Sequence, residues 1–232
     1  MDGGDIPKPA KNDVEVRVGG FEDHFNYPRE GEILVAANTG GQTRHEVDVA
    51  GVKSVEVPSN WSQTTESYLG GRGLISTFSP GGNTDVVLSV LDKGSRLNQD
   101  QTNALDAVLN LADPNGRPRV LLPSQIKSIT EALGTTTVGD NQYTNTAKPP
   151  DPTSPVFKIM SAQVITVDGK PVVEVDGQFV NENGQRVRDY IGIFGKGDGG
   201  HVNQMFLQSS SKDEYIKGRK VYKDALQSLD WK

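Results

Sequence analysis

The residues most suggestive of chemistry form a glycine-rich stretch near the C-terminus. Gly195, Gly197 and Gly200 in FGKGDGGHV match the pattern G-x-G-x-x-G, which binds the pyrophosphate of a dinucleotide when a strand precedes it and a helix follows. The residues that follow here, HVNQMFLQS, alternate in polarity and predict a strand instead. We therefore expect residues 195–200 to form a hairpin loop that needs positive backbone φ angles, and we expect no cofactor.

A second pattern could supply a nucleophile. Ser124 and Lys127 match S-x-x-K, in which a lysine one helical turn away activates the serine hydroxyl. The companion motifs S-D-N and K-T-G do not occur in the sequence. We therefore interpret Ser124 as part of a helix start and Lys127 as an exposed lysine.

The histidines and aspartates predict no metal site. His24, His45 and His201 are far apart and lack the spacing of a zinc motif, although convergence in three dimensions, as in a spatially assembled hydrolase site, remains an alternative. No calcium-binding loop is present, and Asp168, Asp176 and Asp198 each precede a glycine, which turn formation explains. The aspartates considered are Asp140, Asp151, Asp168, Asp176, Asp189 and Asp198.

The two tryptophans, Trp61 and Trp231, stand where predicted segments end. Such residues can anchor a partner, but more often they close the edge of a core, which is the interpretation we favour. Asn60 and Ser62 complete a glycosylation sequon around Trp61. We predict no catalytic, cofactor-binding or metal-binding residue, and the partner-binding residues stay unknown from the sequence.

Composition excludes several classes of protein. The 232 residues contain no cysteine, so disulfides, thiolate catalysis and zinc–cysteine sites are excluded. The net charge is −6 and no block of Lys and Arg stands out, which argues against nucleic acid as the main partner. No apolar run approaches the ~20 residues of a transmembrane helix.

The N-terminus predicts a tether. Residues 1–12, MDGGDIPKPAKN, have almost nothing to bury and are expected to form a flexible tail. We expect a mature exported protein or lipoprotein of a bacterial envelope, in which Met1 replaces a leader and any lipid anchor lay upstream. The alternative is a cytoplasmic protein with a frayed terminus.

Alternating patterns and turn residues predict strands in the first third of the chain. The expected strands are residues 14–18, 32–38, 45–52 and 53–57, followed by a hairpin of residues 73–80 and 85–92 around GGNT. Helical spacing of apolar residues predicts helices at residues 99–113 and 123–134. The proline-rich residues 148–155 are expected to form a long loop or a linker.

The last third of the chain has the most regular pattern. Four strands are expected at residues 156–167, 171–181, 185–195 and 201–209, with Asp168-Gly169 and Asn183-Gly184 as hairpin turns. We expect an antiparallel meander with one buried face. A final helix is expected from about residue 212 to residue 231, with Ser211 and Glu214 as a capping box.

The order of these segments resembles that of the PsbP-like family. The resemblance rests on SVEVPSNW followed by LISTFSPGGNTDVVLSV, and on VITVDGKPVVEVDGQFV, YIGIF and the closing VNQMFLQSSSKDEYIKGRKVYKDALQSLDW, and it covers about residues 52–231. It implies an α/β/α sandwich with a central antiparallel sheet. The family includes an extrinsic photosystem subunit, a Ran-binding protein, and bacterial envelope lipoproteins and secretion chaperones, most of which bind proteins.

These observations together predict an α+β protein of three parts. They are a tail of residues 1–12, a β-rich N-terminal extension of residues 13–51, and a PsbP-like domain of residues 52–232 with a proline-rich loop at 148–155. The expected function is non-enzymatic binding of another protein, or scaffolding. The alternatives are a hydrolase with a spatially assembled site and a structural subunit of an extracellular or virion assembly. Residues 148–155 and 14–52 are the expected interface, because they are what the chain adds to the resembled fold.

Overall fold

The computed structural model describes residues 41–68, 73–81, 85–127 and 155–232. All of them belong to one compact unit, Ala36–Lys232. The predicted tail of residues 1–12, the predicted strands at 14–18 and 32–38, and residues 148–154 of the proline-rich loop lie outside the described residues.

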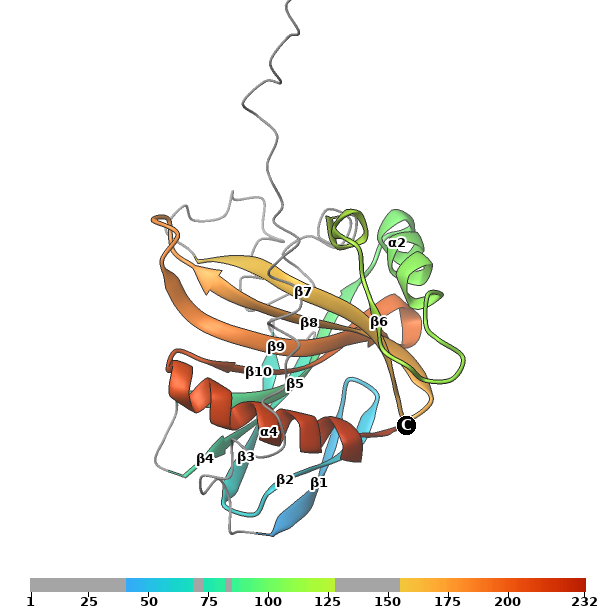
Figure 1. Cartoon of the computed structure of the whole chain (residues 1–232). Helices are drawn as coiled ribbons and strands as arrows, with labels where there is room; N and C mark the ends of the chain where they lie inside the picture. Colours follow the sequence, from blue (N-terminus) through green and yellow to red (C-terminus); the bar gives the residue numbers. More distant parts are fainter. Residues whose placement is uncertain (1–40, 69–72, 82–84, 128–154) are drawn as a thin grey trace, which may run out of the picture. The chain divides into compact units, whose positions relative to one another are not determined.

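Eight strands of the described part form one antiparallel main sheet, in the order β3-β4-β5-β10-β9-β8-β7-β6 (Figure 1). The strands β3 to β5 make one meander, and the strands β7 to β10 make another. The bounds are β3 (Trp61–Tyr68), β4 (Gly73–Pro80), β5 (Val86–Arg96), β6 (Arg119–Val120), β7 (Val156–Val167), β8 (Lys170–Val180), β9 (Arg186–Lys196) and β10 (His201–Ser209).

The two meanders are joined by one pairing between strands that are distant in sequence. Strand β10 pairs with β5 from His201 opposite Arg96 to Ser209 opposite Val86, with one irregularity near the His201 end. This ladder makes a single sheet out of two local hairpin systems.

A smaller antiparallel sheet has the order β1-β2-β11, with β1 (Gln42–Val49), β2 (Val52–Pro58) and β11 (Asp230–Trp231). The two predicted strands at 45–52 and 53–57 correspond to β1 and β2, but the predicted boundary between them is wrong: Ala50 and Gly51 turn the chain with positive φ, and β2 folds back on β1. The predicted boundary between residues 51 and 52 falls in this turn.

Two helices, α2 and α4, have both of their ends within the described residues. The α2 helix (Gln99–Leu109) begins at a capping box, in which Asn98 and Gln101 exchange side-chain-to-backbone hydrogen bonds. The α4 helix (Lys212–Ser228) begins where the Ser211 hydroxyl accepts a bond from the Glu214 amide. It ends before the predicted residue 231, because Asp230 and Trp231 pair with β2 as β11.

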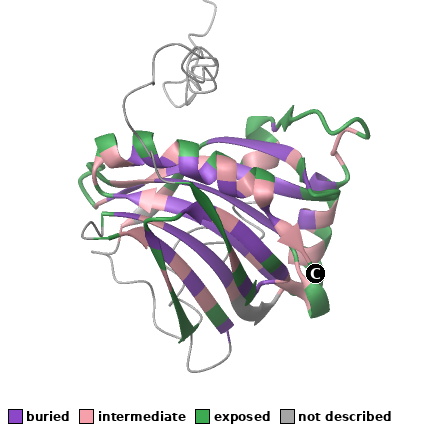
Figure 2. Cartoon of the chain, turned by 90° about the horizontal axis from the view of Figure 1, so that it is seen from below, coloured by how far each residue is buried: buried purple, intermediate pink, exposed green. Residues whose placement is uncertain are grey.

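The two helices pack on opposite faces of the main sheet, because neighbouring residues of a strand point to opposite faces. In β9, Ile191 and Ile193 belong to the core under α4, whereas Tyr190 and Phe194 belong to the core that includes α2. Figure 2 shows buried residues along most of the sheet. The prediction that the meander has one buried face is therefore wrong: both faces are covered.

The predicted α/β/α sandwich is confirmed only in its central antiparallel sheet. The α4 helix does lie on the sheet as expected, packing against β9, β10 and β5, but it also packs against β2. One layer therefore combines a helix with a small sheet. The other layer, in the described part, has α2 against β8.

The hairpin turns agree with the sequence patterns. Asp168 and Gly169 both have positive φ between β7 and β8, as a two-residue turn requires. Residues 195–200 form the predicted hairpin: β9 ends at Lys196, Asp198–Gly200 is a short 3₁₀ turn, and β10 follows at once. The residues after the glycines thus form a strand, whereas a dinucleotide loop would be followed by a helix.

One glycine inside a strand is fixed by packing. The interpretation of Asp176-Gly177 as a turn is wrong, because both residues lie within β8. A Cβ atom at position 177 would come within 2.7 Å of Phe157 Cζ and also meet the Lys158 carbonyl oxygen. Glycine is therefore required there by the close approach of β7.

This packing predicts the effect of adding a single methyl group. Gly177→Ala should lower the free energy of unfolding by about 1–3 kcal/mol, because an overpacked strand must shift, and urea denaturation measures the loss. Gly81→Ala is the matched control, since a Cβ there meets nothing within 4 Å. Equal midpoints for the two variants would show that β7 does not approach β8 as closely as described.

Candidate functional site

The densest group of chemically active side chains lies between the main sheet and α4. We name it the α4 polar cluster; its members are Gln163, Glu174, Asp176, Tyr215, Arg219 and Tyr222. Strands β7 and β8 and helix α4 each contribute members. Residues 174 and 176 share one face of β8, and residues 215, 219 and 222 share one face of α4 by their spacing of four and three.

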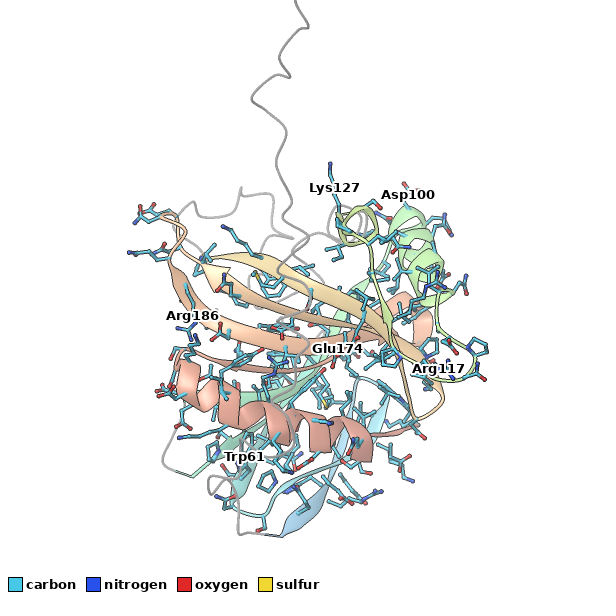
Figure 3. All side chains as sticks on the ribbon, in the orientation of Figure 1. Trp61, Asp100, Arg117, Lys127, Glu174 and Arg186 are labelled. Carbon is cyan, nitrogen blue, oxygen red and sulfur yellow. The ribbon has the colours of Figure 1, made fainter. Side chains whose placement is uncertain are left out.

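Glu174 is the buried centre of this cluster. Its Oε2 accepts a hydrogen bond from Gln163 Nε2 at 2.5 Å, and its Oε1 accepts one from the Tyr222 hydroxyl at 3.1 Å. The residue is 7% exposed and Tyr222 is 2% exposed. Figure 3 shows Glu174 in the middle of the main sheet.

Asp176 forms the second half of the cluster, nearer the start of α4. It accepts a hydrogen bond from the Tyr215 hydroxyl at 3.2 Å and pairs with Arg219 Nη1 at 3.2 Å. The Arg219 guanidinium also lies 5.8 Å from the Tyr215 ring centre. Sheet and helix are therefore linked by charge as well as by hydrogen bonds.

Burial sets the protonation of the cluster. Loss of solvent raises the pKa of Glu174 above its usual value, and the negative charge of Asp176 raises it further; the bonds from Gln163 and Tyr222 and the charge of Arg219 act in the opposite direction without cancelling the rise. Burial likewise raises the pKa of Tyr215 and of Tyr222. The tyrosines thus stay neutral donors.

Two carboxyl groups with different environments could act as an acid and a base. Here, however, both Glu174 oxygens accept bonds from side chains that the fold itself supplies, and α4 covers them. The arrangement is a buried network that fixes the position of α4 on the sheet. Glu174 itself offers no exposed group to a substrate, and the partly exposed Asp176 and Arg219 are paired with each other.

A histidine–carboxylate pair lies at the far end of β10. His201 Nδ1 is 3.3 Å from Asp92 Oδ1, and both side chains are partly exposed. Such a pair orients a general base when a nucleophile is within reach. The hydrogen bond that the structure gives this histidine is the one to Asp92, and whether a nucleophile joins the pair is left to the substrate test described below.

The first edge of the main sheet, β3, is long and regular. Its ladder with β4 runs without a bulge from Trp61 opposite Pro80 to Tyr68 opposite Gly73. Its residues 62 and 64–67 are exposed. Between Trp61 and Tyr68 the sequence is SQTTES, in which Glu66 is the one charge.

Contacts of the Gln63 side chain connect β3 to β4 and β1. The Gln63 Nε2 donates to Ser76 Oγ at 2.9 Å and to the Glu46 carbonyl at 3.2 Å, and its Oε1 lies 3.2 Å from His45 Nδ1. Trp61 is 7% exposed and belongs to the core under α4. The strand therefore presents a fixed backbone, in which every second residue turns its N–H and C=O away from β4.

The opposite edge of the main sheet, formed by β7 and the short β6, has features that block pairing with another strand. Strand β7 is bulged between Ile159 and Ser161, carries the exposed Lys158, and is partly covered by β6 at Val164 and Gln163. Bulges, lysines and short covering strands are the devices by which proteins block edge-to-edge association. In the described part of the chain, β3 has none of them, which makes it the candidate binding site.

The structure brings few of the residues considered from sequence together. Ser124 and Lys127 are exposed in a described helical turn, and Lys127 projects away from the sheet (Figure 3). His45 contacts Gln63 and Phe78, whereas His201 contacts Asp92, so the two described histidines serve different elements. His24, Asp140 and Asp151 lie outside the described residues. Among those described, no three His, Asp or Glu side chains converge as metal ligands.

The remaining residues have structural places. Asp189 pairs with Arg186 at 2.8 Å, and Asp198 stands in the β9–β10 turn. Trp61 and Trp231 close the core as interpreted: the Trp231 indole N–H donates to the Val167 carbonyl at 2.9 Å. Asn60, of the sequon, is exposed between β2 and β3.

Strand β3 itself was missed by sequence reasoning. Its residues are nearly all polar and show no alternation of apolar side chains, which is the signal that predicts a half-buried strand. Three weaker signals were present: the threonines, the aromatic residues at both ends, and the breaks at Pro58 and Gly70-Gly71.

Comparisons with known proteins show a likeness of structure and none of sequence. No family model and no curated protein matches the sequence. A solved structure that matches is cyanobacterial PsbP (CyanoP) from Synechocystis sp. PCC 6803, with a TM-score of 0.47 and 13% identity, over 86% of this chain and 99% of that chain. The likeness is to the family that the sequence pattern resembles, and it concerns the fold alone.

The described helices contain no stretch that is both long and apolar enough to cross a lipid bilayer.

The raised pKa of Glu174 predicts a pH-dependent stability. A carboxyl group whose pKa is higher in the folded state stabilises the fold below its unfolded pKa and loses that contribution as pH rises through the folded value. Glu174→Gln should therefore match the wild type near pH 4 and become the more stable protein towards pH 8. At high pH, the variant should exceed the wild type in free energy of unfolding by about 1.4 kcal/mol for each tenfold decrease that folding causes in the acid dissociation constant of Glu174.

Thermal unfolding between pH 4 and pH 8 measures this difference. Glu182→Gln, in the exposed β8–β9 turn, is the control and should follow the wild type throughout. A Glu174→Gln curve that stays parallel to the wild type would show that Glu174 ionises in the folded protein as freely as in the unfolded chain.

Proposed function

We propose that this chain is a non-enzymatic binding or scaffolding module that adds a strand of its partner to β3. One observation carries the proposal. The strand is an eight-residue, bulge-free edge with exposed residues and no blocking lysine or proline within Ser62–Ser67. Edges of this kind are templates for pairing with another chain.

When a partner strand is added to a sheet edge, the backbone hydrogen bonds supply affinity and the side chains supply specificity. The outward N–H and C=O groups of β3 would bind any extended segment. The exposed side chains would select among such segments: Ser62, Thr64 and Glu66 lie on one face, and Thr65 and Ser67 lie on the other. We expect a favoured partner segment to carry threonine or serine opposite Thr64 and lysine or arginine opposite Glu66.

The same edge would serve a structural subunit of a larger assembly, which is the second candidate. The two candidates differ in how long β3 stays paired, since a structural subunit would keep β3 buried against its neighbour for as long as the assembly exists. The hydrolase alternative would need a nucleophile near His201 and Asp92, and a panel of hydrolase substrates tests it directly. Turnover by the purified chain that Asp92→Asn abolishes would overturn the binding-module proposal.

An extracytoplasmic location is a further part of the proposal. It rests on the composition of residues 1–12, which have almost nothing to bury, and it leaves the leader and any anchor to be determined. Fractionation of the native host with an antibody against the chain tests it. Recovery of the protein with the cytoplasmic fraction would contradict it.

The binding proposal predicts which peptides the chain selects. The immobilised full chain is used to select from a phage library of random peptides, each about 12 residues long, which is enough to span an edge strand. We expect enrichment of peptides that are rich in β-branched residues and lack proline. When such a peptide is added to the chain in solution, it should slow the hydrogen exchange of every second amide of β3. Selected peptides that protect amides elsewhere and leave β3 unchanged would contradict the proposed site.

A pair of proline variants supplies an internal control. Thr64 and Thr65 turn their amides in opposite directions, so one of Thr64→Pro and Thr65→Pro removes an inward bond and costs about 1–3 kcal/mol of stability. The other removes an outward amide, and an edge strand tolerates proline at such a position. The variant that keeps the wild-type melting temperature should lose peptide binding, and unchanged binding would contradict strand addition at β3.

A further inference from the structure

We infer that a second copy of this chain is a partner for the β3 edge, with the two β3 strands antiparallel about a two-fold axis at Thr64. The inference rests on the proposed function and names the partner for the same edge. A two-fold axis perpendicular to the sheet continues both faces from one copy to the other, which is the isologous arrangement of most dimers.

The charges of β3 are compatible with this self-pairing. With the axis at Thr64, residues equally far from it stand opposite each other, so Glu66 of one copy faces Ser62 of the other. Glu66 is the one charge within Ser62–Ser67, and no like charges meet. The Ser62 hydroxyl donates to the Ser79 carbonyl at 3.4 Å in the single chain, and by rotating away from this long bond it can donate to the Glu66 carboxylate at both ends of the pairing.

Existing hydrogen bonds favour Thr64 over Thr65 as the central residue. The Thr65 hydroxyl lies 3.1 Å from Ser76 Oγ on the inner side. Thr64 and Glu66 are exposed, and within the described part of the chain neither side chain has a hydrogen-bond partner. A Thr64–Thr64 pair therefore uses groups that remain free, and cross-strand threonine pairs are favourable.

The size of the contact predicts a weak dimer. Two edge strands overlapping from Trp61 to Ser67 bury much less than the ~1,200 Å² of a stable interface. We therefore expect reversible association at high protein concentration, and a measurement that traps the dimer is the appropriate test.

The absence of native cysteine makes disulfide trapping clean. Opposite residues of an antiparallel pair have Cα atoms about 4.5–5.5 Å apart, within the range that a disulfide spans. Under mild oxidation, Thr64→Cys should form a covalent dimer about tenfold or more faster than Glu182→Cys, an exposed control in the β8–β9 turn, because pairing brings the thiols together.

The register is tested with two further variants. Ser62→Cys and Glu66→Cys should each cross-link slowly alone and quickly when mixed, because the two positions face each other only between copies. Fast cross-linking of Thr64→Cys with no gain on mixing would overturn the register, and a Thr64→Cys rate equal to that of the control would overturn the dimer.

A charge variant tests the same contact without a disulfide. Thr64→Lys places two ammonium groups at the axis and should weaken association at least about tenfold in sedimentation equilibrium. Asn183→Lys, with the same change of charge in an exposed turn, should associate like the wild type. Equal association of the two variants would contradict self-pairing.

The two levels of inference can fail separately. If selected peptides protect β3 amides while Thr64→Cys does not cross-link faster than the control, the dimer is wrong and the binding edge stands. If neither is seen, both are wrong.

Discussion

The antiparallel pairing of β5 with β10 is the constraint on which the rest of this fold depends. It joins Val86–Arg96 to His201–Ser209, two segments far apart in the sequence, and converts two meanders into one sheet. Because α2 follows β5 and α4 follows β10, the helices leave from opposite ends of this ladder. Each then returns over a different face, and both faces of the sheet become buried.

Burial of both faces explains where the polar chemistry lies. On the α4 side, Glu174 and Asp176 of β8 lie beside Gln163 of β7, and α4 contributes Tyr222, Tyr215 and Arg219 as their partners. On the other side, Lys196 of β9 reaches Asp106 of α2 at 2.9 Å. Polar groups in both places are used to position helices over the part of the sheet from β8 to β10, whereas both faces of β3 carry exposed residues.

The parts of the fold that depend on local patterns could be predicted from the sequence. The β7 to β10 meander follows from alternating apolar residues and from Asp168-Gly169 and Asn183-Gly184 as turns. The hairpin at residues 195–200 follows from the absence of helical spacing after the glycines. These signals are local because neighbouring strands are also neighbours in the chain.

The parts that depend on register between distant segments could not be predicted. Asp176-Gly177 has the composition of a turn, yet the glycine is there because Phe157 of β7 packs against it. Nothing in the last helix shows that Asp230 and Trp231 would leave it to pair with β2. The candidate site was missed for a related reason: β3 is recognised by being the edge of a sheet, which is a property of topology and not of its own polar residues.

The central claim is that β3 is an open edge of a fully formed sheet. Amide hydrogen exchange of the dilute, uniformly labelled full chain, followed residue by residue by NMR, tests it most directly. The account predicts that amides in Ser62–Ser67 alternate between slow and fast exchange, while amides on both sides of the β5–β10 ladder exchange slowly. Uniformly slow exchange along β3 would contradict the account, because it would mean that the outward amides are already hydrogen-bonded in the free protein.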